Sequence, residues 1–449
     1  MLNLLTNPVL IAVLVMCVLC LIKVNVLLAI VASALVGGLV AGMPLTEIMS
    51  VFIDKMGGSS ETALNYLLLG IFAVGIYESG ITVILCKKIE KLFGKNAVVL
   101  LLALAVIACF SQNLVPIHIA FIPILVPPLL HLMNSLKLDR RAAACALTFG
   151  LKAPYIALPV GFGALFHTIL AKNMVENGME VAMGDVWHVL IYPALSMAVG
   201  LLIAIFISYR KPREYKDLPI DVGVSEGESS AAVSVDGKIG KKQIGAIAGI
   251  AAAFVIQIIG TRIGMTGALS LGAFAGTFFM VLFGTIPFKS MDTAVNGGVK
   301  LMGFIAFVML VASGFAGVIR ATGGVDEIVA LAVSAVGDNK LVASIVLLLL
   351  GLLITMGIGT SFGTIPVVAT IYVPFCLSMG FSVNATIVLV GVAAALGDAG
   401  SPASDSTLGP TSGLNADGQH NHIWDTCVPT FLHYNIPLLI SGVILSLIL

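Results

Sequence analysis

The chain has 449 residues, of which 59% are hydrophobic and only 10% are charged. Soluble domains carry about 25% charged residues, so this composition excludes an ordinary soluble protein and indicates an all-α polytopic membrane protein. Lysine and arginine total 23, as do aspartate and glutamate, so nothing points to a nucleic-acid partner.

The first apolar segment, residues 4–22, is long enough to span a membrane and does not look like a signal peptide. It has no basic region before it and no clear small-residue cleavage site after it. Lys23 follows, so we expect the N-terminus to lie outside. Cys17 and Cys20 form a C-x-x-C pair here, but their apolar flanks favour inert thiols over a metal or redox site.

Residues 210–242 form the only long polar stretch, rich in serine, glycine and charge, which is typical of a flexible linker. Seven lysines and arginines lie in it, so the positive-inside rule places it in the cytoplasm. The linker separates a first transmembrane repeat, residues 1–209, from a second repeat, residues 243–449.

The two repeats carry similar segments in one order: two apolar segments, a glycine-rich span, two broken regions and a closing apolar span. The glycine-rich spans are predicted at 63–86 and 297–320, and the closing spans at 186–209 and 428–448. The spacing from Gly80 to Gly94 recurs between Gly323 and Gly337. We count seven hydrophobic segments in each half, some of which are re-entrant hairpins. An odd number predicts that the second half enters the membrane upside down, and inverted repeats with discontinuous helices are typical of secondary transporters.

The charges in the loops agree with this topology better in the first half than in the second. The Lys87–Lys95 and Lys137–Arg141 clusters fall on the cytoplasmic side. Arg262, Arg320 and Lys340 fall on the outside, against the usual trend.

Three polar residues interrupt the apolar segments of the first half. Glu78, in "GIYESGI", is either a second titrating group or the end of a helix at the interface. Asn113, in "SQNLVP", is either a ligand or a partner in a helix-to-helix hydrogen bond; His118, nearby, is a weaker candidate. Lys152, in "FGLKAPY", pairs with an aspartate of the other repeat, binds a substrate carboxylate, or extends to the cytoplasmic surface.

In the second half, "GIGTSFGTIP" offers Thr360, Ser361 and Thr364 before a proline. The later stretch "ALGDAGSPASDSTLGP" places Asp398 and Asp405 among small hydroxylated residues. Broken helices persist at membrane depth only where protein or a wet cavity covers their free backbone groups. Both stretches are therefore predicted to be the tips of discontinuous helices.

Ser401 is a plausible N-cap for the helix after the break, with Pro402 at its first position. Intramembrane carboxylates are costly and usually functional. Burial disfavours the charged form of a carboxylate and a nearby Na⁺ favours it, so H⁺ and Na⁺ compete for one site. We expect Asp398 to exchange the proton, with Asp405, Ser401 and Thr407 completing the oxygen cage.

His420 and His422 form an H-x-H pair beside Asp417 and Asp425. The surrounding "ADGQHNHIWD" favours a wet polar loop over a metal site.

The stretch "GDAGSPASDSTLGP" resembles the G-D-x-x-S-P-x-S-D-[ST]-T signature of the NhaC-type sodium/proton antiporter family, and "GTSFGT" is similar to its G-T-S-[WF]-G-T element. The resemblance implies the ion transporter superfamily, with inverted repeats, paired helical hairpins and an elevator mechanism. It also implies ion or substrate binding by residues of both stretches: Asp398, Ser401, Ser404, Asp405, Ser406, Thr407, Thr360, Ser361 and Thr364. The continuation "LGPTSGLNADGQHNH" departs from the family pattern. Chains of this kind also resemble a branch suspected of carrying amino acids, histidine among them.

We expect a transporter of the cytoplasmic membrane and not an enzyme, with Na⁺ or H⁺ as coupling ion and no cofactor. It either exchanges Na⁺ for H⁺ or moves an amino acid or small carboxylate with the ion. An intramembrane aspartyl protease is less well supported, because both aspartates lie on one stretch. The sequence lacks the G-x-x-x-x-G-K-[ST] phosphate loop of a primary pump. Small residues in segments 24–42 and 263–285 predict a homodimer.

Overall fold

Every regular element that the computed structural model describes is a helix. The described residues are 6–22, 24–81, 96–113, 122–160, 162–218, 240–263, 265–324, 327 and 339–449. In these ranges, eight helices are long and apolar enough to cross a membrane. The predicted all-helical, multi-pass membrane protein is thereby confirmed. Lys23, the Lys87–Lys95 cluster and His118 lie outside the described residues.

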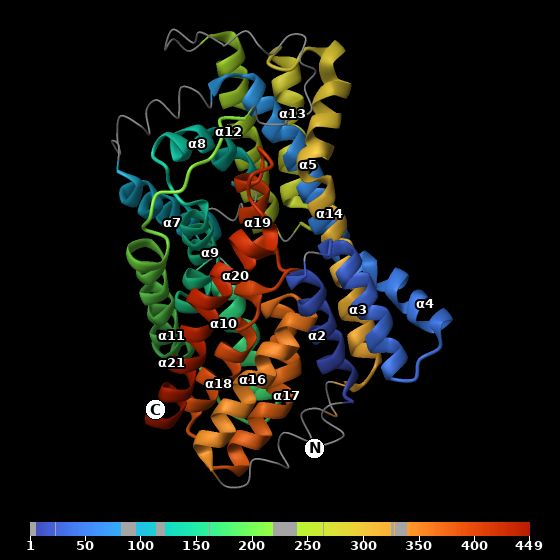
Figure 1. Cartoon of the computed structure of the whole chain (residues 1–449), viewed down its shortest axis with the longest axis vertical. Helices are drawn as coiled ribbons and strands as arrows, with labels where there is room; N and C mark the ends of the chain where they lie inside the picture. The colour runs from blue at the N-terminus through green and yellow to red at the C-terminus, as the bar shows by residue number, and fades with distance from the viewer. Residues whose placement is uncertain are drawn as a thin grey trace.

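Helices precede and follow the linker segment in the chain (Figure 1). The first half contains α2 (Pro8–Leu21), α3 (Val26–Val40), α4 (Leu45–Met56), η1 (Gly57–Ser59), α5 (Ser60–Glu78), α7 (Ala97–Asn113), α8 (Ile122–Ser135), α9 (Arg140–Ala157), α10 (Phe162–Glu176), α11 (Met183–Ile203) and η3 (Ala204–Ser208). The second contains α12 (Lys241–Arg262), α13 (Ala268–Leu282), η4 (Phe288–Ser290), α14 (Met291–Ala321), α16 (Lys340–Ile358), α17 (Ser361–Ser378), α18 (Val383–Ala395), η5 (Asp398–Gly400), α19 (Asp405–Leu414), η6 (His422–Cys427), α20 (Val428–Thr430), η7 (Phe431–Asn435) and α21 (Ile436–Ile448).

Several apolar helices are too short to cross a bilayer alone. The 15 residues of α3 and the 15 of α13 each rise about 22 Å, less than the roughly 30 Å of a hydrocarbon core. The seven hydrophobic segments predicted for each half therefore include short helices that pack against a neighbour: α3 against α2, and α13 against the longer α12.

Helices α16 and α17 form a hairpin that enters and leaves on one side of the molecule (Figure 1). Lys340 Nζ, at the start of α16, donates to the Gly380 carbonyl just after α17, at 2.6 Å. The turn between the helices comprises Gly359 and Thr360. A Cβ on Gly359 would lie 3.6 Å from the carbonyl oxygen of Ala403. The hairpin turn thus lies against the broken stretch of the second half.

The crossing formed by α18 and α19 is broken between Ala395 and Asp405. Gly397 turns the chain there with a φ of 82°, which is left-handed backbone that favours glycine. A Cβ on Gly397 would lie 2.7 Å from the Leu352 carbonyl oxygen and 2.8 Å from Met356 Cγ of α16. Glycine therefore allows both the turn and the close approach to the hairpin.

The predicted cap of the helix after the break is wrong. Ser404, not Ser401, is the N-cap of α19, and Pro402 precedes the helix instead of occupying its first position. Ser404 has extended backbone, with φ −87° and ψ 143°, and its Oγ accepts a hydrogen bond from the Ser406 amide at 3.2 Å. The unwound stretch is consequently three residues longer than the sequence pattern predicted, which places more backbone at the break.

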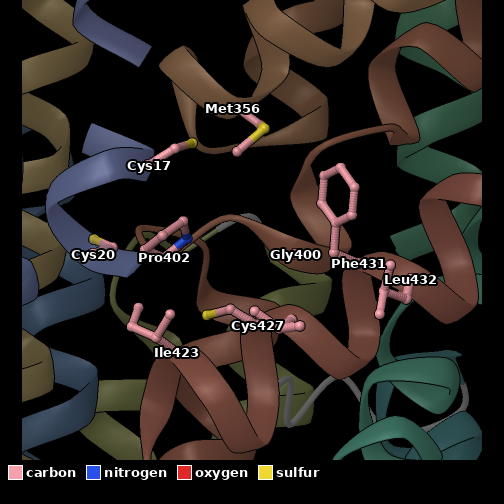
Figure 2. Close-up of a pocket in the computed structure, with 10 residues that line it drawn as sticks. Cys17, Cys20, Met356, Gly400, Pro402, Ile423, Cys427, Phe431 and Leu432 are labelled. Carbon is pink, nitrogen blue, oxygen red and sulfur yellow. The ribbon is translucent and has the colours of Figure 1, made fainter. Parts of the chain in front are cut away.

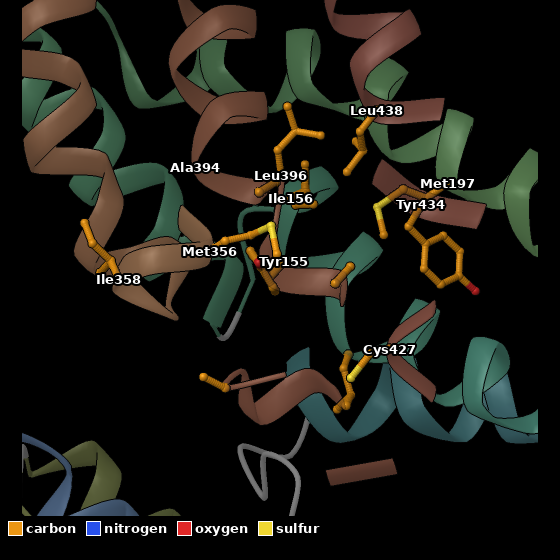
Figure 3. Packing of buried hydrophobic residues seen from close by; sticks show 14 of the residues in the cluster. Tyr155, Ile156, Met197, Met356, Ile358, Ala394, Leu396, Cys427, Tyr434 and Leu438 are labelled. Carbon is orange, nitrogen blue, oxygen red and sulfur yellow. The ribbon is translucent and has the colours of Figure 1, made fainter. Parts of the chain in front are cut away.

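Buried apolar side chains form two separate clusters. The larger cluster surrounds the break, where Tyr155, Met356 and Leu396 lie close together (Figure 3). The smaller cluster joins α5, α12, α13 and the start of α14 through residues such as Phe72 and Met280. Helix α5 contributes to both clusters, through Tyr66 to the larger and Phe72 to the smaller, whereas the clustered residues of α12 and α13 belong to the smaller one.

The first residues of the linker lie on the side of the molecule where α8 meets α9. The Arg213 amide donates to the Lys137 carbonyl at 2.9 Å, and Arg213 Nη1 pairs with Asp425 Oδ1 at 2.7 Å. Beneath them, the fully buried Arg140 binds both carboxylate oxygens of Asp417, at 2.6 and 2.5 Å. Burial opposes the ionisation of Asp417, but hydrogen bonds from Arg140 and its charge hold the Asp417 pKa below the usual value.

Asp417→Asn is expected to destabilise the protein by about 3–5 kcal/mol, because it leaves the Arg140 charge buried without a carboxylate. Thermal unfolding of the purified protein measures this effect. Folding lowers the pKa of Asp417, so its contribution is present above the unfolded value of about 4 and is lost as the pH falls below it. The difference in thermal stability between Asp417→Asn and the wild type should therefore shrink as the pH is lowered. Glu214→Gln, in the exposed pair with Lys137, is the control; equal losses in both variants would contradict the interpretation.

Candidate functional site

Asp398 is 2% exposed and has both carboxylate oxygens hydrogen-bonded. Lys152 Nζ forms an ion pair with Oδ2. The Ser361 hydroxyl donates to the same oxygen at 2.6 Å and the Ser361 amide does so at 3.3 Å. Ser404 and Ser406 donate to Oδ1, the latter at 3.2 Å. The structure thus brings together α9, the start of α17, the break and the start of α19 around one carboxylate.

Tyr155 closes this cluster and was not identified from the sequence. It follows Lys152 by three residues on α9, a spacing that puts both side chains on one helix face. Its hydroxyl accepts a hydrogen bond from Lys152 Nζ at 3.2 Å and lies 2.7 Å from Ser361 Oγ. Its ring packs against Phe166 and Phe362, with centroids 5.1 and 5.7 Å away. The K-x-x-Y spacing beside Lys152 is the signal that could have identified it.

The Lys152–Asp398 pair is buried at a high desolvation cost, so its stability depends on the contacts that offset this cost. The two side chains are only 6% and 3% exposed. Removing each ion from water costs several kcal/mol, and the attraction between them offsets this only with good geometry and further hydrogen bonds. A proton or Na⁺ arriving at the carboxylate would compete directly with the lysine ammonium. The arrangement is therefore able to exchange cations at one buried carboxylate.

Other predicted hydroxyls stabilise the backbone and do not contact Asp398. Thr407 Oγ1 donates to the carbonyls of Ser401 and Ser404 at 2.6 and 3.0 Å. Ser401 Oγ accepts from the Ala403 amide at 3.2 Å, and Thr364 Oγ1 donates to the Thr360 carbonyl at 2.9 Å. The oxygens around Asp398 come from Ser361, Ser404 and Ser406 instead of from Ser401 and Thr407.

Asp405 and Thr360 line a polar cavity of about 610 Å³ next to the cluster. Its other walls come from α4, η1, α5 and α14. Glu78 is not part of this site, because it lies 16 residues after the cavity residue Thr62 on α5, about 24 Å along the helix. Asn113 is the last residue of α7, and its side chain lies outside the described part of the structure.

A second pocket, of about 220 Å³, also borders the break and is apolar (Figure 2). Gly400 and Pro402 line it together with the thiols of Cys17, Cys20 and Cys427. All three cysteines are free. The C-x-x-C pair of the first helix thus faces the break across a small apolar space.

Of the two histidines after α19, His420 is buried and His422 is half-buried, which differs from the wet loop predicted. His420 is 2% exposed, and its Nε2 lies 2.7 Å from Thr426 Oγ1. His422 Nε2 lies 2.9 Å from the Pro402 carbonyl oxygen in the break. The linker covers this loop: the Lys216 amide donates to Gln419 Oε1 at 2.9 Å. Composition alone does not reveal such cover from a distant segment.

A multi-pass helical protein with a hairpin, a broken crossing and an ion pair buried where they meet belongs to the class of membrane transporters. The sequence pattern of the Na⁺/H⁺ antiporter family matches residues 146–443, and a second Na⁺-H⁺ antiporter family pattern matches residues 7–93. The first match spans more than half of the chain, so the chain belongs to the Na⁺/H⁺ antiporter family. The resemblance drawn from "GDAGSPASDSTLGP" and "GTSFGT" is thereby confirmed.

The chain is also similar to other membrane proteins over nearly its whole length. An uncharacterized membrane protein of Vibrio parahaemolyticus is 51% identical over 455 residues, covering 99% of this chain and all of the relative. The putative amino acid transporter YuiF of Bacillus subtilis is 46% identical, with 99% and 100% covered. Among solved structures, the YdaH transporter of Alcanivorax borkumensis is 15% identical, covers 90% of this chain and 88% of its own, and has a TM-score of 0.43.

Proposed function

We propose that the protein is a secondary active transporter of the cytoplasmic membrane that couples a Na⁺ or H⁺ gradient to transport at Asp398. The observation that carries this proposal is the Lys152–Asp398 ion pair, buried between the hairpin turn and the break. Intramembrane ion pairs of this kind are costly and mark ion pathways.

In the empty transporter, Lys152 neutralises Asp398. When H⁺ or Na⁺ takes the carboxylate, the Tyr155 hydroxyl, 3.2 Å from Lys152 Nζ, remains as an acceptor for the ammonium. Na⁺ prefers hard oxygen ligands, which the hydroxyls of Ser361, Ser404 and Ser406 supply beside the carboxylate. Binding of H⁺ or Na⁺ thus releases the contact between Lys152 and Asp398. This links ion loading to the arrangement of α9, which carries Lys152, and α17, which begins with Ser361.

The same proposal assigns the two repeats opposite orientations, with the linker in the cytoplasm and the N-terminus outside. The helices around the break carry the ion in an elevator movement past α12 and α13, whose buried apolar side chains belong to the smaller cluster. We also propose a homodimer through α3 and α13. On α13, Leu271, Phe274 and Phe278 are exposed at 45%, 58% and 57%, and the small residues between them allow close helix approach.

A second candidate is ion-coupled transport of an amino acid or small carboxylate. The cavity beside Asp405 holds about 610 Å³, within the roughly 300–1,000 Å³ typical of small-molecule sites and far more than one ion needs. The name of the relative YuiF agrees with this candidate.

The test is transport by the purified protein in proteoliposomes with imposed Na⁺ and pH gradients. Free amino acids are screened against no added solute, with protein-free liposomes as control. We expect a gradient of one of the two ions to drive net movement of the other or of a solute. Absence of any gradient-driven flux of ions or solutes would overturn the proposal.

A further inference from the structure

The last long helix of the chain is irregular where it passes the break. Two π-helical segments, η6 and η7, flank the short α20, and all three contact η5, which begins with Asp398. A π-turn is a rare departure from α-helical geometry that occurs frequently at functional sites. The polar side chains that these segments direct at the break are therefore candidates for a role in ion coupling.

Asn435, the last residue of η7, contacts the turn next to the coupling carboxylate. The Gly397 amide donates to Asn435 Oδ1 at 3.3 Å, and Asn435 is only 2% exposed. Gly397 has the left-handed backbone that turns the chain, with φ 82°, and Asp398 follows it directly. A side chain 38 residues further along the chain thus binds the amide of the residue that sets the direction of Asp398.

This contact also fixes the orientation of the Asn435 carboxamide. The Gly397 amide is a donor, so only the carboxamide oxygen can face it, and Nδ2 points away. Within the described part of the chain, Nδ2 is buried and has no hydrogen-bond partner. An unsatisfied buried donor destabilises the folded state. An apolar side chain would avoid this cost but lose the contact with Gly397, so that contact is what the polar group contributes.

The segment η7 connects the elements that carry the two partners of the ion pair. Tyr434 Oη donates to the Cys145 carbonyl at 2.5 Å, on the same helix, α9, as Lys152. Phe431, at the start of η7, packs tightly on the break: a Cβ on Gly400 would lie 2.6 Å from Phe431 Cβ (Figure 2). Movement of η7 would therefore be felt on both sides of the ion pair.

We propose that Asn435 is a positioning residue for ion coupling: its carboxamide oxygen fixes the Gly397 turn, and this turn holds Asp398 in the direction of its partners. This inference rests on the proposed function, in which Asp398 is the coupling carboxylate. Contacts that orient an ion ligand from outside typically change ion affinity by roughly 10–100-fold when they are removed.

Ion binding to the purified full-length protein in detergent tests this role without any gradient. Thermal unfolding is measured against NaCl concentration, with choline chloride keeping the ionic strength constant, and against pH without Na⁺. The half-maximal Na⁺ concentration and the midpoint pH are compared between variants. The part of each response that Asp398→Asn removes is assigned to this carboxylate.

Two variants remove the contact in different ways. Asn435→Leu keeps a similar branched shape without an acceptor, and Asn435→Ser is smaller, so it fits without overpacking, but its hydroxyl is too short to reach Gly397. Thr430→Val is the matched control. Thr430 is also buried on the same segment, but its hydroxyl donates only to the nearby carbonyls of Thr426 and Cys427, at 2.8 and 3.1 Å.

We expect Asn435→Leu and Asn435→Ser to lower the apparent Na⁺ affinity about tenfold, because the oxygen ligands no longer converge. The midpoint pH should rise in both variants, since ionised Asp398 loses its fixed contact with Lys152 and a proton then competes more easily. Thr430→Val should leave both values unchanged. Opposite changes in the affinities for Na⁺ and H⁺ are not the result of a general loss of stability.

The positioning role and the proposed function fail in different ways. If Asn435→Leu and Asn435→Ser keep the wild-type values, or if Thr430→Val changes them as much, Asn435 is not a positioning residue, while the function proposed for Asp398 stands. If Asp398→Asn responds to Na⁺ and pH like the wild type, the coupling site itself is refuted, and the positioning role with it.

Discussion

Asp398→Asn is expected to abolish ion-coupled transport. An asparagine still takes part in hydrogen bonds with Ser361 and Ser404, but it has no proton to exchange and no charge to balance Na⁺. Transport activity should fall by more than the roughly 10–100-fold that follows mutation of a residue that only supports an ion ligand. Transport measured against pH and Na⁺ concentration in proteoliposomes gives the answer, and the pH dependence of coupling should disappear.

A loss of folding is separated from a loss of function by the paired variant. Asp398→Asn alone leaves the buried Lys152 without its counter-charge, which destabilises the protein. Lys152→Gln/Asp398→Asn removes both charges and should recover thermal stability while remaining uncoupled. If Asp398→Asn and Asp405→Asn both transport with normal ion and pH dependence, the ion site lies elsewhere.

Gly397→Ala is expected to destabilise the protein and to abolish transport, because it changes the turn on which the break depends. An alanine at φ 82° pays about 1–2 kcal/mol for left-handed backbone. Its Cβ would also lie 2.7 Å from the Leu352 carbonyl oxygen and 3.0 Å from the Met356 amide nitrogen. These are backbone atoms that cannot rotate away, so overpacking adds about 1–3 kcal/mol.

Gly380→Ala is the matched control. Gly380 also has positive φ, 66°, but a Cβ there meets nothing within 4 Å. Thermal unfolding should show a small loss for Gly380→Ala and a clearly larger one for Gly397→Ala, with transport kept only in the former. Equal losses would mean that the close approach of the break to α16 does not matter.

The sequence predicted the long helices well because their signal is local. The closing span predicted at 186–209 corresponds to α11 and η3, which together cover 183–208. The span predicted at 297–320 lies within α14. A run of apolar residues long enough to cross a bilayer has few alternatives, so hydropathy alone locates it.

The details of the site depend on contacts between distant segments, which local patterns do not contain. Lys152 and Asp398 are 246 residues apart. The sequence was consistent with two partners for Lys152, an aspartate or a substrate carboxylate, and with an unpaired side chain at the cytoplasmic surface. Ser401 and Ser404 are chemically equivalent caps, and the path of the chain after Gly397 decides between them. Arg320 was visible only as an exception to the charge pattern of the loops; the structure places it in a cavity wall.

The buried ion pair has a consequence for the way the proposed transport depends on the membrane voltage. With Lys152 protonated and Asp398 ionised, the pair is electrically neutral, so in the proposed transport cycle this form would cross the membrane field without electrical work. Loading Asp398 with H⁺ or Na⁺ while Lys152 stays protonated would leave one positive charge at the site. Carrying that charge through 100 mV corresponds to about 2.3 kcal/mol. Inward movement of the loaded form and outward return of the empty form would then have different voltage dependence, and a negative interior would favour uptake.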